Sequence, residues 1–112
     1  MRFAAAIAIV LIAGNANAQD AASGNRMLGF CKEALVSKNT DAMHGVCLGA
    51  ISAILYLSDF LDPRIKFCKP ATVTAAQGIS IAVRYMENHP ELLHQDFQLL
   101  SVLGFMEAWP CK

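Results

Sequence analysis

Four cysteines are the residues with the clearest chemistry in this chain. Cys31, Cys47, Cys68 and Cys111 are separated by 16, 21 and 43 positions (31 to 47, 47 to 68, 68 to 111). Structural zinc sites draw their cysteines from pairs roughly two to four residues apart, so this spacing does not favour a metal site. An even number of cysteines in a short exported chain indicates disulfides instead. We therefore expect two disulfides.

The histidines and carboxylates do not form a catalytic pattern. His89 and His94 lie five residues apart with Pro90 between them, so they do not share a helix face. Asp59 and Asp62 could do acid–base work as a pair, but the solvated end of an apolar helix accounts for them more simply. The sequence contains no glycine-rich phosphate loop, no HExxH and no CxxC. We therefore expect no enzyme, with no catalytic residue, no cofactor and no metal.

The N-terminus has the layout of a secretory signal peptide. Met1-Arg2 is a short basic start, an unbroken apolar run extends from Phe3 to Ala13, and Ala16-Asn17-Ala18 is a small-x-small cleavage triplet. The apolar run is shorter than the about twenty residues that span a bilayer. We expect cleavage between Ala18 and Gln19 and a periplasmic mature protein; the alternative is an uncleaved membrane anchor.

The segment that follows has the size and charge of one small domain. It contains eight basic and nine acidic residues, because Arg2 is one of the nine basic residues of the chain. This balance provides no basic surface for nucleic acid. A domain of this size buries only about 60–65% of its unfolded surface, so covalent crosslinks help to stabilise it. We expect a signal peptide over residues 1–18 and a single domain over residues 19–112, with no membrane contact after cleavage.

Apolar residues recur with helical spacing in four segments, which predicts four helices and no sheet. The segments are residues 23–37, 40–61, 74–88 and 96–108. Ser23 and Thr40 can cap the first two helices, and Thr74 with Gln77 has the spacing of a capping box at the third. The residues expected to face inward are Met27, Phe30, Cys31, Ala34 and Leu35 in the first helix, Ile79, Ala82, Val83 and Met86 in the third, and Leu99, Leu100, Leu103 and Met106 in the fourth.

The second helical segment is apolar almost all round from Val46 to Leu57. A helix of this composition is normally central, so we expect other elements to cover it on several sides, with His44 partly exposed near its start. Membrane insertion is the alternative. His44 and Asp59 bracket fourteen residues (45 to 58), too few to span a bilayer.

Helix geometry predicts how the cysteines pair. If the first two helices form an antiparallel hairpin that turns near Asn39, Cys31 and Cys47 lie eight residues before and after the turn, at the same height on facing helices. If the last two helices form a second hairpin, Cys68 and Cys111 both lie at its open end. We therefore expect the pairs Cys31–Cys47 and Cys68–Cys111. The predicted fold is an all-α compact bundle of four helices, made of two α-hairpins stapled by two disulfides.

The connection between the last two helices is the candidate partner-binding site. Aromatic and apolar residues gather around it, and such residues on a loop are more informative about binding than the same residues in a core. His89, Glu91, His94 and Gln95 are the expected exposed contacts, whereas Leu92, Leu93 and Phe97 could simply plug the end of the bundle. The predicted partner-binding residues are Asn88, His89, Pro90, Glu91, Leu92, Leu93, His94 and Gln95.

An ordered set of motifs resembles a known family. The set is Cys47-Leu48-Gly49-Ala50-Ile51, Phe67-Cys68-x-Pro70, Val73-Thr74-x-x-Gln77, Val83-x-Tyr85-Met86-x-x-His89-Pro90-Glu91-x-Leu93-His94 and Trp109-Pro110-Cys111. Together these motifs resemble the Rap/Tai type of immunity proteins, small periplasmic inhibitors of type VI secretion amidase effectors. Ala50 departs from the family pattern, where an aromatic residue is common, and so does Gly78, where leucine is frequent.

The resemblance implies a non-catalytic helical protein and a homodimer. It also implies that loop 88–96 reaches into the cleft of a peptidoglycan amidase and occludes it. The alternative function is a periplasmic acid-stress chaperone of the small, disulfide-bonded helical type, which would release apolar surface when its carboxylates are protonated at low pH.

Overall fold

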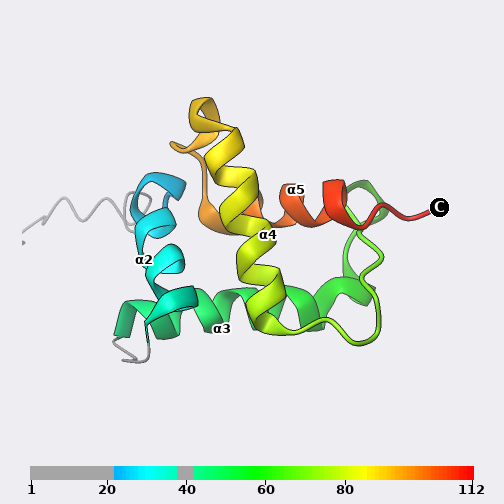
Figure 1. Cartoon of the computed structure of the whole chain (residues 1–112). Helices are drawn as coiled ribbons and strands as arrows, with labels where there is room; N and C mark the ends of the chain where they lie inside the picture. Colours follow the sequence, from blue (N-terminus) through cyan, green and yellow to red (C-terminus); the bar gives the residue numbers. More distant parts are fainter. Residues whose placement is uncertain (1–21, 38–41) are drawn as a thin grey trace, which may run out of the picture.

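The computed structural model describes residues 22–37 and 42–112, and within them the fold is all-α. Its elements are α2 (Gly24–Val36), α3 (Ala42–Tyr56), the 3₁₀ turns η1 (Leu57–Phe60) and η2 (Pro63–Ile65), α4 (Ala75–Asn88), η3 (Pro90–Leu92) and α5 (Phe97–Ala108) (Figure 1). The described part thus contains the four predicted helices and no strand. The predicted signal peptide, its cleavage site, the turn near Asn39 and the Thr40 cap lie outside the described residues.

Side-chain caps begin two of the helices as predicted. The Ser23 side chain accepts a hydrogen bond from the Arg26 N–H at the start of α2. At the start of α4 the Gln77 N–H donates to Thr74 Oγ1 (3.2 Å) and the Thr74 N–H donates to Gln77 Oε1 (2.8 Å). These bonds satisfy backbone donors that the first turn of a helix leaves without a partner.

Both predicted disulfides are present. Cys31 on α2 is bonded to Cys47 on α3, and both residues are fully buried. Cys68, which precedes α4, is bonded to Cys111, which follows α5. The first disulfide therefore joins the first two helices, and the second joins the two chain segments that flank α4 and α5. In Figure 1 the helices of each pair cross steeply and do not lie antiparallel.

The core forms around α4, which packs extensively against each of the other three helices. Ile79, Ala82, Val83 and Met86 are all buried, as the helical spacing predicted. Gly78 lies where α4 crosses α3: a Cβ atom there would be 2.8 Å from Ile51 Cγ2 and 3.0 Å from Leu55 Cδ1. Glycine at this position therefore permits a close approach of the two helices that a larger residue would prevent.

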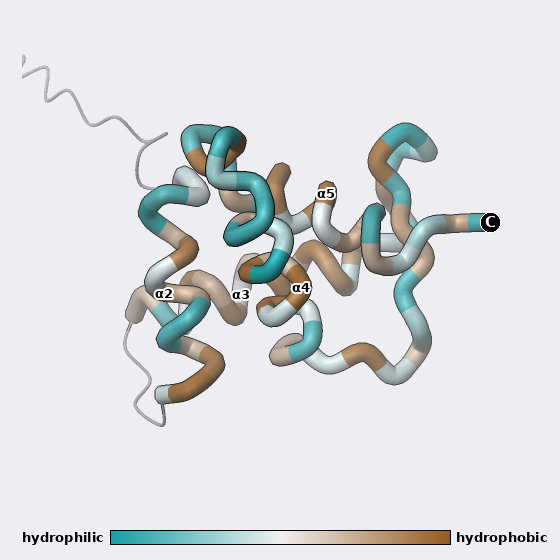
Figure 2. The backbone as a smooth tube through the Cα atoms, turned by 45° about the horizontal axis from the view of Figure 1, so that its top comes forward, coloured by the Kyte–Doolittle hydropathy of each residue, from teal (hydrophilic) through white to brown (hydrophobic). Residues whose placement is uncertain are grey.

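The expectation that α3 is the central helix is wrong. Only one stripe of it is buried, formed by His44, Cys47, Ile51 and Leu55. The opposite side faces solvent and remains apolar, and Figure 2 shows the hydropathy along this helix. The exposed large apolar residues of α3 and η1 are Val46, Leu48, Tyr56, Leu57 and Phe60. An all-round apolar composition indicated burial on several sides, but the chain covers one side only.

The length argument against membrane insertion of this segment is also wrong. Helical structure continues through η1, so that the stretch Ala42–Phe60 has 19 residues and is long and apolar enough to cross a membrane by length and composition. The core helices of soluble proteins can pass the same test. Within the structure, 28% of the most apolar window of this stretch is buried.

Two expected inward residues face solvent instead. Leu35 on α2 is 38% exposed and Leu99 on α5 is 42% exposed. In α5 the fully buried positions are Phe97, Leu100, Ser101 and Phe105, and Phe105 stacks against Trp109 with ring centroids 5.4 Å apart. Because α5 is apolar on nearly every side, its sequence does not select the face that packs.

Loss of the Cys68–Cys111 disulfide should lower the free energy of unfolding. The bond closes a loop of 44 residues (68 to 111), for which the chain-entropy model gives up to about 4 kcal/mol. Cys68 is exposed, so Cys68→Ser with Cys111→Ser introduces little new burial of a hydroxyl group. We expect a lower urea midpoint for this double variant under oxidising conditions. Equal midpoints for the variant and the oxidised wild type would contradict a stabilising role for this bond.

Candidate functional site

The predicted partner-binding residues form one compact turn between α4 and α5. The His89 N–H donates to Met86 O (3.2 Å) as α4 ends, the Leu92 N–H donates to His89 O (3.0 Å), and the Gln95 N–H donates to Leu92 O (2.9 Å). Asp96 then occupies the N-cap position of α5. In Figure 1 this turn lies at the end of α4 remote from α3. The structure therefore brings the predicted residues together at one end of the molecule.

Backbone hydrogen bonds join the start of α2 to the turn. The Gly24 N–H donates to Gln95 O (2.9 Å), the Asn25 N–H donates to Leu93 O (2.8 Å), and the Phe97 N–H donates to Ala22 O (2.7 Å). The unpaired N–H groups of the first turn of α2 thus find their acceptors in the turn. Nothing in the sequence pattern indicated this contact, because it depends on how α2 packs beside α5.

Gly24 permits this close approach. A Cβ atom at Gly24 would lie 2.5 Å from Leu100 Cδ1 and 3.1 Å from Leu93 O. A larger residue would therefore have to displace either the turn or α5.

The apolar residues of the turn anchor it to the core. Phe97 is fully buried, and Leu92 and Leu93 are half-buried and pack against the core. These positions agree with the interpretation that the three residues plug the end of the bundle. The exposed members of the predicted site are Asn88, Pro90, Glu91, His94 and Gln95, with His89 half-buried.

A small polar cluster occupies the exposed side of the turn. His89 Nδ1 lies 3.1 Å from Glu91 Oε1, and His89 Nε2 lies 4.0 Å from Glu107 Oε2. The His89 ring also packs against the Tyr85 ring, with centroids 4.2 Å apart. His94 Nε2 lies 3.1 Å from Gln95 Nε2. The two histidines therefore belong to separate contacts and do not converge on one point.

The cluster changes the pKa values of two of its members. The pKa of Glu91 is lowered from 4.5, first by a hydrogen bond to its own backbone N–H and then by the bond to His89. The pKa of Tyr85 is raised from 10.0 by burial and by the negative charges of Glu107 and Glu91. At neutral pH the turn consequently presents a fixed carboxylate beside an imidazole and a neutral phenol, groups suited to polar recognition.

Two further candidate residues, His44 and Asp62, have local structural partners. His44 is buried, with Nε2 3.4 Å from Glu33 Oε2, so the expectation that it is partly exposed is wrong. Asp62 bonds Arg64 through a 2.9 Å contact, and this side-chain hydrogen bond lowers the Asp62 pKa. Across residues 22–37 and 42–112, no group of three or more His, Cys, Asp or Glu side chains is placed to hold a metal ion.

The lowered pKa of Glu91 can be measured directly. We expect its carboxyl carbon to titrate with a midpoint below 4.5 in an NMR experiment between pH 2 and 7. The stabilisation from this carboxylate is then present above pH 4.5 and is lost as the pH falls through the folded midpoint. His89→Ala should raise the midpoint only in part, because the backbone donor remains, and His94→Ala is the control that should leave it unchanged. A wild-type midpoint at or above 4.5 would contradict this account.

Comparison with known proteins identifies the family. The family model of the Rap1a immunity proteins matches residues 23–111, a range that includes both disulfides, the four described helices and the turn between α4 and α5. No curated protein and no solved structure matches the chain. The family match covers well over half of the chain and agrees with the resemblance carried by its motifs, so the chain belongs to the Rap1a immunity protein family.

Proposed function

We propose that this protein is an exported, non-catalytic inhibitor that neutralises a peptidoglycan amidase effector of a type VI secretion system. In this proposal, loop 88–96 covers the active-site cleft of the amidase. Membership in an immunity protein family supports a protein effector as the partner. The same membership favours this function over that of an acid-stress chaperone.

The observation that most supports the proposal is the fixed conformation of loop 88–96. Backbone bonds from Gly24 and Asn25 hold the loop from behind, and half-buried Leu92 and Leu93 anchor it to the core. Its polar side remains accessible. A loop that is ordered before binding loses little conformational entropy when it enters a cleft, so more of the contact energy is available as affinity.

The two disulfides support the periplasm as the place of action. Disulfides form and persist in oxidising compartments and are rare in the cytosol. The predicted signal peptide over residues 1–18 would provide the route of export. Cleavage between Ala18 and Gln19 would leave the whole described structure intact.

Alanine substitution of exposed side chains tests whether the loop contacts the amidase. We expect the triple variant His89→Ala, Glu91→Ala, His94→Ala to bind a candidate amidase at least about tenfold more weakly in calorimetry, because exposed polar contacts at the centre of an interface are lost. The matched control is Asp62→Ala, Arg64→Ala, Lys66→Ala, which removes another exposed ion pair and a third polar residue. Undiminished binding by the loop variant would remove the loop from the mechanism.

We further propose a homodimer formed through the exposed face of α3 and η1. This face carries Val46, Leu48, Tyr56, Leu57 and Phe60, of which Tyr56 and Phe60 are 78% and 79% exposed. Within α3 and η1, Asp59 is the only Asp, Glu, Lys or Arg residue, so two copies can meet with little repulsion between like charges. A Cβ atom at Gly45 or Gly49 would have nothing within 4 Å, which leaves room for a second helix to approach closely.

The dimer contact would leave the loop free, since α3 and the loop lie at opposite ends of α4 (Figure 1). We expect wild-type protein to sediment as a dimer, and the variant Leu48→Lys, Tyr56→Lys to sediment as a monomer with an unchanged helical CD spectrum. Gln98→Lys, an exposed substitution on α5, is the control for added positive charge. A monomeric wild type over a wide concentration range, or binding of this face to lipid vesicles instead, would contradict the proposal.

A further inference from the structure

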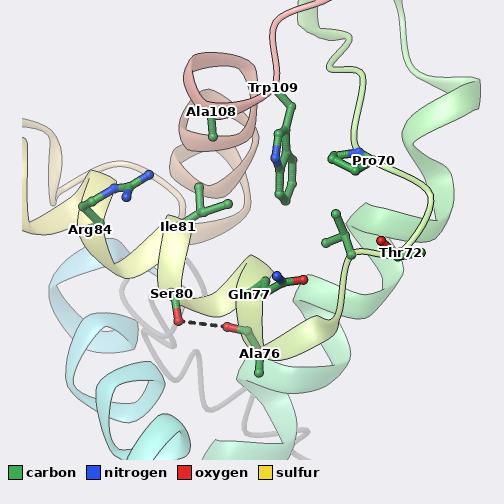
Figure 3. A pocket seen from close by; sticks show the side chains of 10 residues that line it. Pro70, Thr72, Ala76, Gln77, Ser80, Ile81, Arg84, Ala108 and Trp109 are labelled. Carbon is green, nitrogen blue, oxygen red and sulfur yellow. Dashed lines mark hydrogen bonds between the residues drawn. The ribbon is translucent and has the colours of Figure 1, made fainter.

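An open groove runs along α4 on the side that faces the end of α5. It has a volume of about 560 Å³ and is bounded by Pro70 and Trp109 on one side and by Arg84 on the other, with Ala76 and Ile81 along α4 (Figure 3). This volume falls in the range of about 300–1,000 Å³ that is common for ligand-binding pockets. Neither the family match nor the proposed role of loop 88–96 assigns a use to this groove.

The groove offers hydrogen-bond donors and one unpaired cation. Arg84 is exposed and has no ion-pair partner within the described part of the chain, in contrast to Lys32 and Arg64, whose carboxylate partners are identified. None of the other residues that line the groove is charged. Gln77 uses its Oε1 atom to accept from the Thr74 N–H (2.8 Å), which leaves its amide N–H₂ group to donate to a ligand. The Arg84 guanidinium is complementary to a carboxylate. The Gln77 amide lies about two helical turns away along α4, toward Thr72 and Trp109, and can donate to a backbone carbonyl of a bound peptide (Figure 3).

The apolar wall of the groove is held in a fixed position. The Cys68 N–H donates to Trp109 O (2.8 Å), and the Cys68–Cys111 disulfide joins the two chain segments that carry Pro70 and Trp109. The Trp109 ring also packs against Phe105, with centroids 5.4 Å apart. A ligand therefore meets a preformed surface, where an indole ring and a proline supply apolar contact area.

The groove is continuous with the base of loop 88–96. A smaller hollow of about 80 Å³ shares Ile81, Arg84 and Ala108 with the groove and extends to Tyr85 and Asn88. Arg84 and Glu107 both line this second hollow, so charges of both signs lie between the groove and the loop. A molecule that covers the loop can therefore extend along α4 without leaving the hollowed surface.

We infer that the groove binds a second segment of the partner that loop 88–96 contacts. The segment is an extended peptide with an acidic side chain beside an apolar or aromatic one. The carboxylate binds Arg84, the Gln77 amide donates to a peptide carbonyl, and the apolar side chain packs against Trp109 and Pro70. An open groove of this length suits a peptide better than a small molecule, which gains affinity from enclosure on most sides. The identity of the partner rests on the proposed function, whereas the recognition chemistry of the groove does not.

A short peptide tests the groove without the amidase. The probe is the capped tripeptide Leu-Asp-Phe, added at millimolar concentration to the oxidised wild-type protein, with Leu-Asn-Phe as its uncharged counterpart. We expect the acidic peptide to shift the NMR signals of the Trp109 indole N–H and the Arg84 Nε–H, and Arg84→Glu to abolish the shifts. Lys66→Glu, an equal charge reversal at an exposed residue outside the groove, should leave them unchanged. Absent shifts, or equal shifts with the asparagine peptide, would overturn the inference.

Measurements of amidase affinity distinguish the contribution of the groove from that of loop 88–96. We expect Arg84→Glu and Ala76→Phe, which fills the groove from an exposed helix position, each to weaken binding about tenfold, whereas Lys66→Glu and Gln98→Phe do not. Normal affinity in both groove variants, with lost affinity in the loop variant, would exclude the groove from the partner contact and leave the proposed function standing. If wild type binds no amidase, the proposed function fails, and the peptide measurement still decides whether the groove recognises acidic peptides.

Discussion

Gly78 allows α4 to cross α3 at a distance that a side chain would prevent. The position of its missing Cβ is 2.8 Å from Ile51 Cγ2, 3.0 Å from Leu55 Cδ1 and 3.6 Å from Phe105 Cζ. At this crossing, α3 and α5 both reach α4, and the buried side chains of the three helices meet. Glycine lowers helix stability by up to about 1 kcal/mol relative to alanine. The buried apolar contacts made possible by the close approach offset that cost.

Because α4 packs against every other helix, it also positions both candidate binding surfaces. Loop 88–96 begins where α4 ends, and the groove follows the exposed side of the same helix. Neither disulfide contains a residue of α4, so both bonds fix segments of the chain that flank this helix. One bond joins α2 to α3, and the other holds the chain segments that carry Pro70 and Trp109. The arrangement places a rigid helix between covalently fixed neighbours, which suits surfaces that bind without rearranging.

The apolar residues are arranged differently at the two ends of α4 (Figure 1). Around loop 88–96, Leu92, Leu93 and Phe97 turn inward and leave a polar exterior. On α3 and η1, the residues of the outward face remain exposed although most of them are apolar. Large exposed apolar patches in soluble proteins commonly mark interaction sites. In the proposed function, the polar loop contacts the effector and this separate apolar surface serves self-association.

Local signals in the sequence were sufficient for the ends of α2, α4 and α5 to within one residue and for the Ser23 and Thr74 caps, because capping and helical periodicity act over short distances along the chain. They did not predict the end of α3, which gives way to η1 after Tyr56. Both disulfide pairs were predicted as well, but Cys68 and Cys111 lie 43 residues apart, and their pairing rested on an assumed arrangement of the helices. The buried stripe of α4 was also predictable, since its apolar residues lie on one face only. Tertiary packing alone decided which side of α3 and α5 is buried, as both helices are apolar nearly all round and offer no preferred face. Packing likewise produced the bonds from α2 to loop 88–96 and the groove beside Trp109, which arise only when segments distant in the sequence meet.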